Sequence, residues 1–96
     1  MNIQVNNMAA KWYKEELDME NSSFLRYFVR YGGKGHIPGF SLGIKQESPE
    51  YIHTSVKVNG ITFFIEESDK WYFDGVDLLV DFDTKLNEPV FTYQPN

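Results

Sequence analysis

A serine between two glycines is the first feature that suggests catalysis. Residues 39–43 read Gly-Phe-Ser-Leu-Gly and fit the G-x-S-x-G pattern of a nucleophile elbow. Such a hydrolase needs an acid and then a histidine farther along the chain. The only later histidine is His53, and the only acids between Ser41 and His53 are Glu47 and Glu50, six and three residues before the histidine. Apolar residues also alternate through this segment as in one continuous strand. We therefore predict that Ser41 is an ordinary strand residue, that the chain has no catalytic residue, and that it is not an enzyme.

Basic side chains accompany a glycine-rich segment, a combination that suits an anion. Residues 32–39 read Gly-Gly-Lys-Gly-His-Ile-Pro-Gly, with Lys34 inside the segment and Arg30 just before it. The spacing of a Walker phosphate loop is absent. Backbone N–H groups of such a loop can still hold an anion. A small anion-binding module is therefore one alternative function.

The chain contains two imidazoles and no cysteine. His36 and His53, together with carboxylates, have the chemistry to bind a divalent metal, so an iron-binding protein is another alternative. The sequence has no metal-ligand spacing, however. Residues 81–83 begin like a calcium loop, but Leu86 and Thr92 stand where an EF-hand needs Gly and Glu. No specific metal site and no cofactor are predicted from these residues.

An RNA-binding pattern is present only in part. Residues 28–31 match the last four positions of the RNP1 pattern, but Arg26 and Tyr27 break the preceding positions. The formal net charge is −5 and the sequence pI is about 4.9. Because the phosphate backbone demands a basic footprint, we exclude nucleic acid as a partner.

The charge is unevenly distributed along the chain. Segment 21–46 contains no acid, whereas segment 66–88 carries eight acids and two lysines. The cations of the first segment are Arg26, Arg30, Lys34 and Lys45. This asymmetry predicts a basic face and an acidic face that steer partners. Arg30, Lys34 and His36 are the predicted partner-binding residues.

Length and composition predict one small, well-folded domain over residues 1–96. The chain is 42% hydrophobic and includes 16 aromatic residues, which can fill a core of modest size. The absence of cysteine suits a reducing compartment. No charged leader or long apolar run is present, so neither a signal peptide nor a membrane span is predicted. We therefore expect a cytoplasmic protein that makes no contact with a membrane.

One amphipathic helix is predicted near the start of the chain. A short strand over 3–5 precedes it, and Asn6 or Asn7 is the expected cap. The apolar positions that recur at helical spacing are Met8, Ala9, Trp12, Tyr13 and Leu17. The turn-forming residues 21–23 end the helix.

About six short strands are predicted after the helix. Period-two alternation begins at residue 24, and Asn59-Gly60 between two β-prone runs predicts a type I′ hairpin. Segment 67–73 is predicted to form one helical turn or a loop. The fold class is therefore mainly β, a β-rich α+β fold, with one helix packed on a mostly antiparallel sheet or open barrel.

The order of these pieces resembles the HesB-like family, the A-type iron–sulfur cluster carriers typified by IscA. The resemblance covers essentially the whole chain. It rests on Phe28-Val29-Arg30, the glycine loop, Phe40-Ser41-Leu42-Gly43, the Asn59-Gly60 hairpin, Phe73-Asp74-Gly75 and the last six residues. It implies a compact pseudo-barrel or sandwich with one main helix.

The resemblance also implies a function in iron–sulfur cluster biogenesis. Family members hold iron or a cluster with three cysteines, and the loop cysteine is replaced here by Lys34. The implied protein is a non-enzymatic accessory factor that has no thiolate ligands of its own. It would bind a protein partner of the assembly machinery and can form a homodimer, as family members often do. Iron or a cluster enters only by family analogy.

Overall fold

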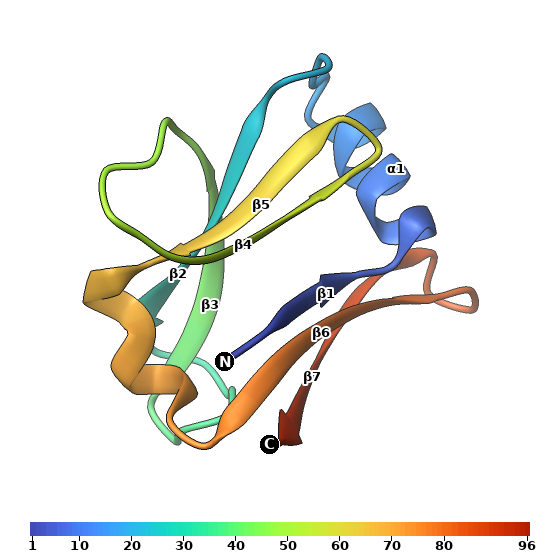
Figure 1. Cartoon of the computed structure of the whole chain (residues 1–96). Coiled ribbons are helices and arrows are strands. Elements are labelled where there is room, and N and C mark those ends of the chain that lie inside the picture. The colour runs from blue at the N-terminus through green and yellow to red at the C-terminus, as the bar shows by residue number, and fades with distance from the viewer.

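Two β-sheets enclose the hydrophobic core in the computed structural model, which describes residues 1–96 (Figure 1). The three-stranded sheet has the order β1 (Ile3–Val5), β6 (Val76–Asp83), β7 (Glu88–Pro95). The four-stranded sheet has the order β3 (Phe40–Gln46), β2 (Phe24–Tyr31), β5 (Ile61–Glu66), β4 (Ile52–Val58). The helices are α1 (Asn7–Glu16) and the 3₁₀ helix η1 (Glu67–Phe73).

Both sheets are mixed. The β1–β6 and β2–β5 pairs are parallel, and the remaining pairs are antiparallel. The predicted mainly β fold with one N-terminal α-helix is therefore confirmed. The strands form two separate sheets and no barrel, because neither sheet closes on itself.

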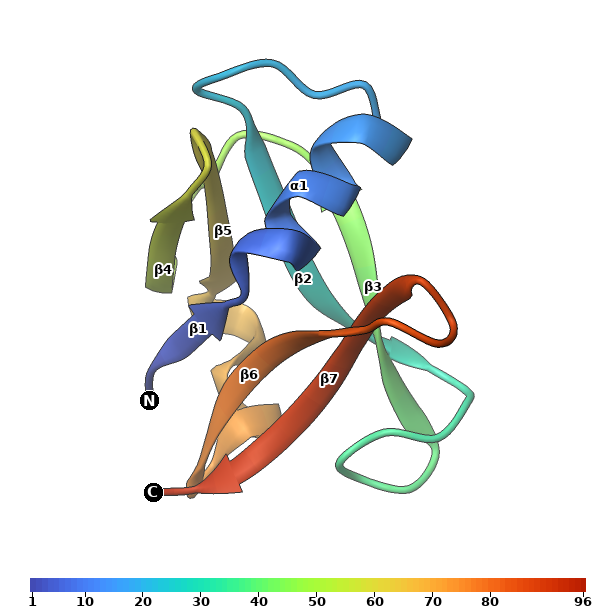
Figure 2. The same cartoon turned by 90° about the vertical axis from the view of Figure 1, so that its right-hand side faces the viewer.

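The cap of α1 is Asn6, one of the two asparagines expected from the sequence. The side chain of Asn6 accepts a hydrogen bond from the backbone N–H of Met8 at 2.7 Å. Ala9, Ala10 and Tyr13 form the buried face of the helix. Figure 2 shows α1 running beside β2 and β5 and above the β6–β7 hairpin. The helix thus closes one side of the space between the two sheets.

Aromatic side chains dominate the core. Tyr27 of β2 stacks on Phe63 of β5 with ring centroids 6.1 Å apart, and Tyr13 of α1 packs against both. The largest fully buried side chains are Tyr27, Tyr72, Phe63, Phe64, Phe73, Leu25, Ile61, Ile65, Leu78 and Val80. Burial raises the pKa of Tyr13 to about 12. Large rings thus supply the apolar area that so short a chain needs.

The β4–β5 hairpin has the predicted turn. Asn59 and Gly60 have φ values of 53° and 80°, as a type I′ turn requires, and Val58 pairs with Ile61. An unbroken register from this turn would pair His53 with Glu66, but the register shifts near His53 and Ile52 pairs with Glu66 instead.

Glu66 has a different use. Its two carboxylate oxygens accept the backbone N–H groups of Glu50 and Tyr51, each at 2.7 Å. This buried carboxylate therefore fastens the loop before β4. His53 turns instead to Glu67, with 3.6 Å between Nδ1 and Oε1.

Gly60→Ala should destabilise the protein more than Gly75→Ala. Both glycines have positive φ, at 80° and 77°, so each alanine costs about 1–2 kcal/mol of backbone strain. A Cβ at Gly75 meets open space, whereas one at Gly60 would lie 2.5 Å from Oδ1 of Asn21. That oxygen also accepts a 2.6 Å hydrogen bond from Lys14, so moving it costs about 1 kcal/mol more. Urea unfolding measures both variants, and equal losses would contradict the Asn21 contact.

Candidate partner-binding surface

The glycine-rich loop 32–39 joins β2 to β3 at the end of the molecule where η1 lies (Figure 1). We call this loop, together with the aromatic residues Tyr31, Phe40 and Trp71, the loop surface. Two of its aromatic residues flank the loop in sequence, and Trp71 is brought to it by η1.

Two tyrosines, the buried Tyr72 and the half-buried Tyr93, hold the loop in place. The backbone N–H of His36 donates to the hydroxyl of Tyr72 at 2.7 Å, and the His36 ring stacks on Tyr93 with centroids 5.0 Å apart. A side chain at Gly35 would collide with the same Tyr72 hydroxyl, so only glycine fits there. Burial, with Tyr72 beside it, raises the pKa of Tyr93, which therefore stays neutral under the imidazole. The loop is a fixed structure rather than a free one.

A row of three aromatic rings, exposed at both ends and half-buried at Phe40, borders the loop. Tyr31 and Phe40 lie 5.1 Å apart between ring centroids, and Phe40 and Trp71 lie 5.3 Å apart. Tyr31 is 89% exposed and Trp71 is 49% exposed. Exposed tyrosine and tryptophan side chains are the residue types that dominate protein–protein binding energy.

Of the four cations in the acid-free segment, two are neutralised by acids from outside it. Nη2 of Arg26 lies 2.9 Å from Oδ2 of Asp69, and Nζ of Lys45 lies 3.6 Å from Oε1 of Glu47. Burial works against the charge of Arg26, but its carboxylate partners outweigh this and raise its pKa. Arg30 has only a 3.2 Å hydrogen bond to the hydroxyl of Ser41.

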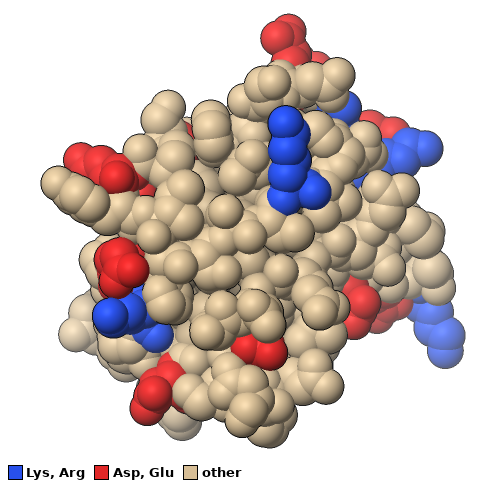
Figure 3. All heavy atoms as spheres, viewed as in Figure 1, with Lys and Arg blue, Asp and Glu red and all other residues tan.

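Lys34 and Arg30 therefore remain without an acidic partner, and both are exposed. On the side seen in Figure 3, acidic and basic side chains are interspersed around a broad uncharged area and are not divided into two faces. The positive charge of segment 21–46 is thus confined to a few positions near the loop. Lys34 and His36 share the loop, whereas Arg30 lies on β2 and points to the sheet face opposite Tyr31.

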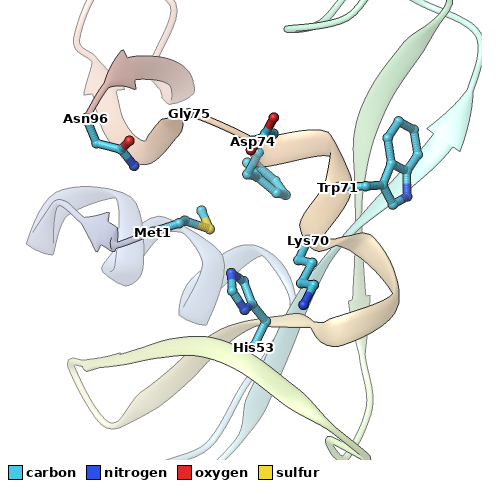
Figure 4. A pocket seen from close by; sticks show the side chains of 8 residues that line it. Met1, His53, Lys70, Trp71, Asp74, Gly75 and Asn96 are labelled. Carbon is cyan, nitrogen blue, oxygen red and sulfur yellow. The ribbon is translucent and has the colours of Figure 1, made fainter.

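The histidines do not form a metal site. No group of three or more His, Cys, Asp or Glu side chains is placed to hold a metal ion. His36 is stacked in the loop, whereas His53 lines a hollow with Met1, Lys70 and Asn96 (Figure 4). The metal-binding alternative has no support, because the two imidazoles lie in different environments without converging carboxylates.

Trp71 borders the same hollow, but its ring points away from it (Figure 4). The indole packs instead against Phe40 of the loop surface. Sequence reasoning missed this aromatic row, since residues 31, 40 and 71 belong to different elements. The available signal was a pair of aromatic residues at the two ends of a glycine loop.

The comparison with known proteins gives the family. No family model matches the chain. A Bacillus subtilis (strain 168) protein named pyruvate dehydrogenase inhibitor is 52% identical to it over 95 residues, which cover 98% of this chain and 100% of that protein. The chain belongs to the family of this inhibitor.

Staphylococcal proteins of the same family are more distant. A Staphylococcus saprophyticus protein is 36% identical over 92% of this chain and 94% of its own length. A Staphylococcus haemolyticus protein is 34% identical over 84% of this chain and 86% of its own length. The names of both describe them as uncharacterized. None of the helices is long and apolar enough to span a lipid bilayer.

These findings correct the resemblance to the HesB-like, IscA-like family. No family model supports it, and the relative that matches over the full length is named for a different function. The assignment to iron–sulfur cluster biogenesis was wrong, and with it the view of Lys34 as the position of a lost cysteine ligand. The motifs behind it were mainly turns and glycine loops, whose residues are set by local backbone chemistry that recurs across folds.

The anion-binding alternative is also without support. A glycine loop binds an anion through free backbone N–H groups. In this loop the N–H of His36 is already taken by Tyr72, and the N–H of Gly32 donates to the carbonyl of Gly39 at 2.8 Å. Both N–H groups therefore have acceptors within the protein and are not available to an anion.

Tyr72→Phe should loosen the loop without unfolding the protein. Removing the hydroxyl leaves the His36 N–H without its acceptor, at a cost of about 1–2 kcal/mol. We expect the His36 amide to exchange with solvent roughly tenfold faster, since about 1.4 kcal/mol is a factor of ten. NMR hydrogen exchange measures this. Tyr31→Phe is the control, because that hydroxyl is exposed and makes no hydrogen bond. An unchanged His36 exchange rate would contradict the assigned role of Tyr72.

Proposed function

We propose that this protein binds a pyruvate dehydrogenase and inhibits it, as a regulatory protein without catalytic activity of its own. The observation that carries the proposal is the 52% identity, along the whole of both chains, to the Bacillus subtilis protein named for that inhibition. Identity at this level without truncation favours retention of the same partner surface.

Inhibition by contact fits the chemistry of the candidate residues. Ser41, the one residue that matched a nucleophile pattern, lies within β3. Its hydroxyl accepts a hydrogen bond from Arg30 and makes none to a histidine that could take its proton. His53 faces Glu67 at 3.6 Å between Nδ1 and Oε1. These contacts support a protein that acts by occupying a surface of the enzyme.

The loop surface is the part of the chain that we propose to contact the enzyme. Its aromatic row provides apolar anchors, and Lys34 provides positive charge that no acid of the chain neutralises. Arg30, also without an acidic partner, lies just before the loop on β2 and points to the sheet face opposite Tyr31. The Tyr72 hydrogen bond keeps the loop in one shape before binding. A preorganised loop loses less entropy on association, which favours affinity. His36 then acts mainly by holding the loop on Tyr93.

The direct test is a titration of the enzyme with the purified chain. The pyruvate dehydrogenase of the organism that encodes the chain should lose activity in a saturable manner as the chain is added. Sedimentation velocity should show the two proteins moving together. Full activity at a large excess of the chain, with no co-sedimentation, would overturn the proposed function.

Lys34→Glu should weaken inhibition roughly five- to fiftyfold, because it replaces an unpaired cation of the loop surface with an acid. Lys57→Glu on β4 is the matched control. It makes the same charge change at an exposed lysine that has no ion pair and lies on another sheet edge. The concentration for half-inhibition measures both variants. An equal effect of the two would show that net charge matters and that the loop surface does not.

A further inference from the structure

Three of the four sheet edges in this fold are protected against further strand pairing. β7 contains Pro89 and Pro95, and β1 is three residues long. The register of β4 shifts between Ile52 and Thr54, and β1 lies beside this strand. Prolines, short strands and irregular pairing all prevent the addition of another strand.

β3 has none of these protections. It pairs with β2 through seven consecutive residue pairs and lies at the end of the four-stranded sheet. Gly32 donates its N–H to the carbonyl of the opposite residue, Gly39, so these two form a hydrogen-bonded pair. From there, hydrogen-bonded and non-hydrogen-bonded pairs alternate along β2 and β3. By that alternation Ser41, Gly43 and Lys45 bond to β2, and the backbone groups of Leu42 and Ile44 point away from the sheet.

The free edge of β3 also lies beside an apolar groove. Trp12 of α1 and Phe91 of β7 line this groove together with Leu42 and Ile44. Ile44 is 37% exposed although it faces the core side of the sheet. Pro89, Glu88 and Arg30 also line it, so the groove contains one acid and one cation beside its apolar residues. A strand added along β3 would therefore bury apolar side chains on this side.

The opposite face of the edge carries one cation without an acidic partner. Ser41 and Lys45 point to this face, and Lys45 pairs with Glu47 at 3.6 Å. Arg30 of β2, which has no acidic partner, lies 3.2 Å from the Ser41 hydroxyl. Gly43 has no side chain here because the ring of Phe28 covers it. An incoming strand thus meets apolar groups on one side and the unpaired Arg30 on the other, in the alternation that a strand presents.

We propose that β3 binds an extended segment of the inhibited enzyme, which joins the four-stranded sheet as a fifth strand. The enzyme as partner rests on the proposed function. The segment carries apolar residues on the side of Trp12 and at least one acid on the side of Arg30 and Lys45. Backbone hydrogen bonds to Leu42 and Ile44 supply affinity, and the alternating side chains supply specificity.

Charge favours the enzyme over a second copy of the chain as the occupant. A two-fold axis at Gly43 would pair Leu42 of one copy with Ile44 of the other, so the backbone geometry alone permits a dimer. Such a dimer joins two chains of net charge −5, and β3 of the second copy, residues 40–46, contains no acid that could pair with Arg30. A segment of the enzyme that carries an acid would supply this partner. β3 also begins at Phe40, so its edge continues the loop surface.

Hydrogen exchange at single residues tests the proposal. The amides of Leu42 and Ile44 should exchange at least tenfold more slowly when the pyruvate dehydrogenase is bound, with the chain released and read by NMR after quenching. The amides of Ser41 and Gly43 should be slow with or without the enzyme. Unchanged Leu42 and Ile44 rates in the complex would overturn the proposal. If the Leu42 and Ile44 amides exchange more slowly when the concentration of the chain alone is raised, the occupant of the β3 edge is a second copy of the chain. That result would also overturn the proposal.

A proline variant provides the second test. Ile44→Pro removes an N–H that points away from β2, so the β2–β3 ladder is kept, and inhibition should weaken at least tenfold. Ser55→Pro is the control. Hydrogen-bonded and non-hydrogen-bonded pairs also alternate between β4 and β5, and the N–H of Ser55 points away from β5. Circular dichroism shows whether each of the two variants folds. If Ile44→Pro does not fold, the hydrogen-exchange experiment alone tests the proposal.

The two proposals fail in different ways. A wild-type chain that does not inhibit the enzyme removes the proposed function. A wild-type chain that inhibits, together with a folded Ile44→Pro variant that inhibits equally well, overturns the strand addition and leaves the inhibition intact.

Discussion

The hydrogen bond from the His36 amide to the buried Tyr72 hydroxyl is the contact on which the candidate surface depends. The ring of Tyr72 is fully buried and packs edge-on against Phe73 and Tyr93, with centroids 5.2 and 6.0 Å away. Its position is therefore set by the core. Through one polar atom the core fixes a loop of glycines that would otherwise sample many conformations. The packing of the core around Tyr72 therefore determines the shape of the loop surface.

The same fold also leaves the unpaired positive charge of the acid-free segment near the loop. The chain carries a net charge of −5, yet two of the cations in its acid-free segment are consumed by ion pairs with Glu47 and Asp69. The positive charge that remains unpaired in that segment lies at Arg30 and Lys34, near an exposed aromatic row and a free strand edge. Apolar anchors with unpaired charge beside them are typical of surfaces that recognise another protein.

Local chemistry in the sequence predicted a good part of the fold. The cap at Asn6, the Asn59-Gly60 turn and the period-two strands all follow from short-range backbone preferences, and the structure confirms them. The same short-range signals misled the functional assignment. Turns and glycine loops in a familiar order suggested iron–sulfur chemistry, whereas the relative that is 52% identical is named for the inhibition of an enzyme. Turn residues report backbone geometry and carry little information about a partner.

The sequence by itself determined the mainly β class, the N-terminal helix and the position of the hairpin turn, because these depend on residues that are neighbours along the chain. Only the tertiary structure decided which cations are neutralised, how Trp71 joins Tyr31 and Phe40, and which strand edge stays free. Each of these depends on contacts between residues tens of positions apart. Such contacts are selected by the packing of the two sheets as a whole, and no local pattern encodes them.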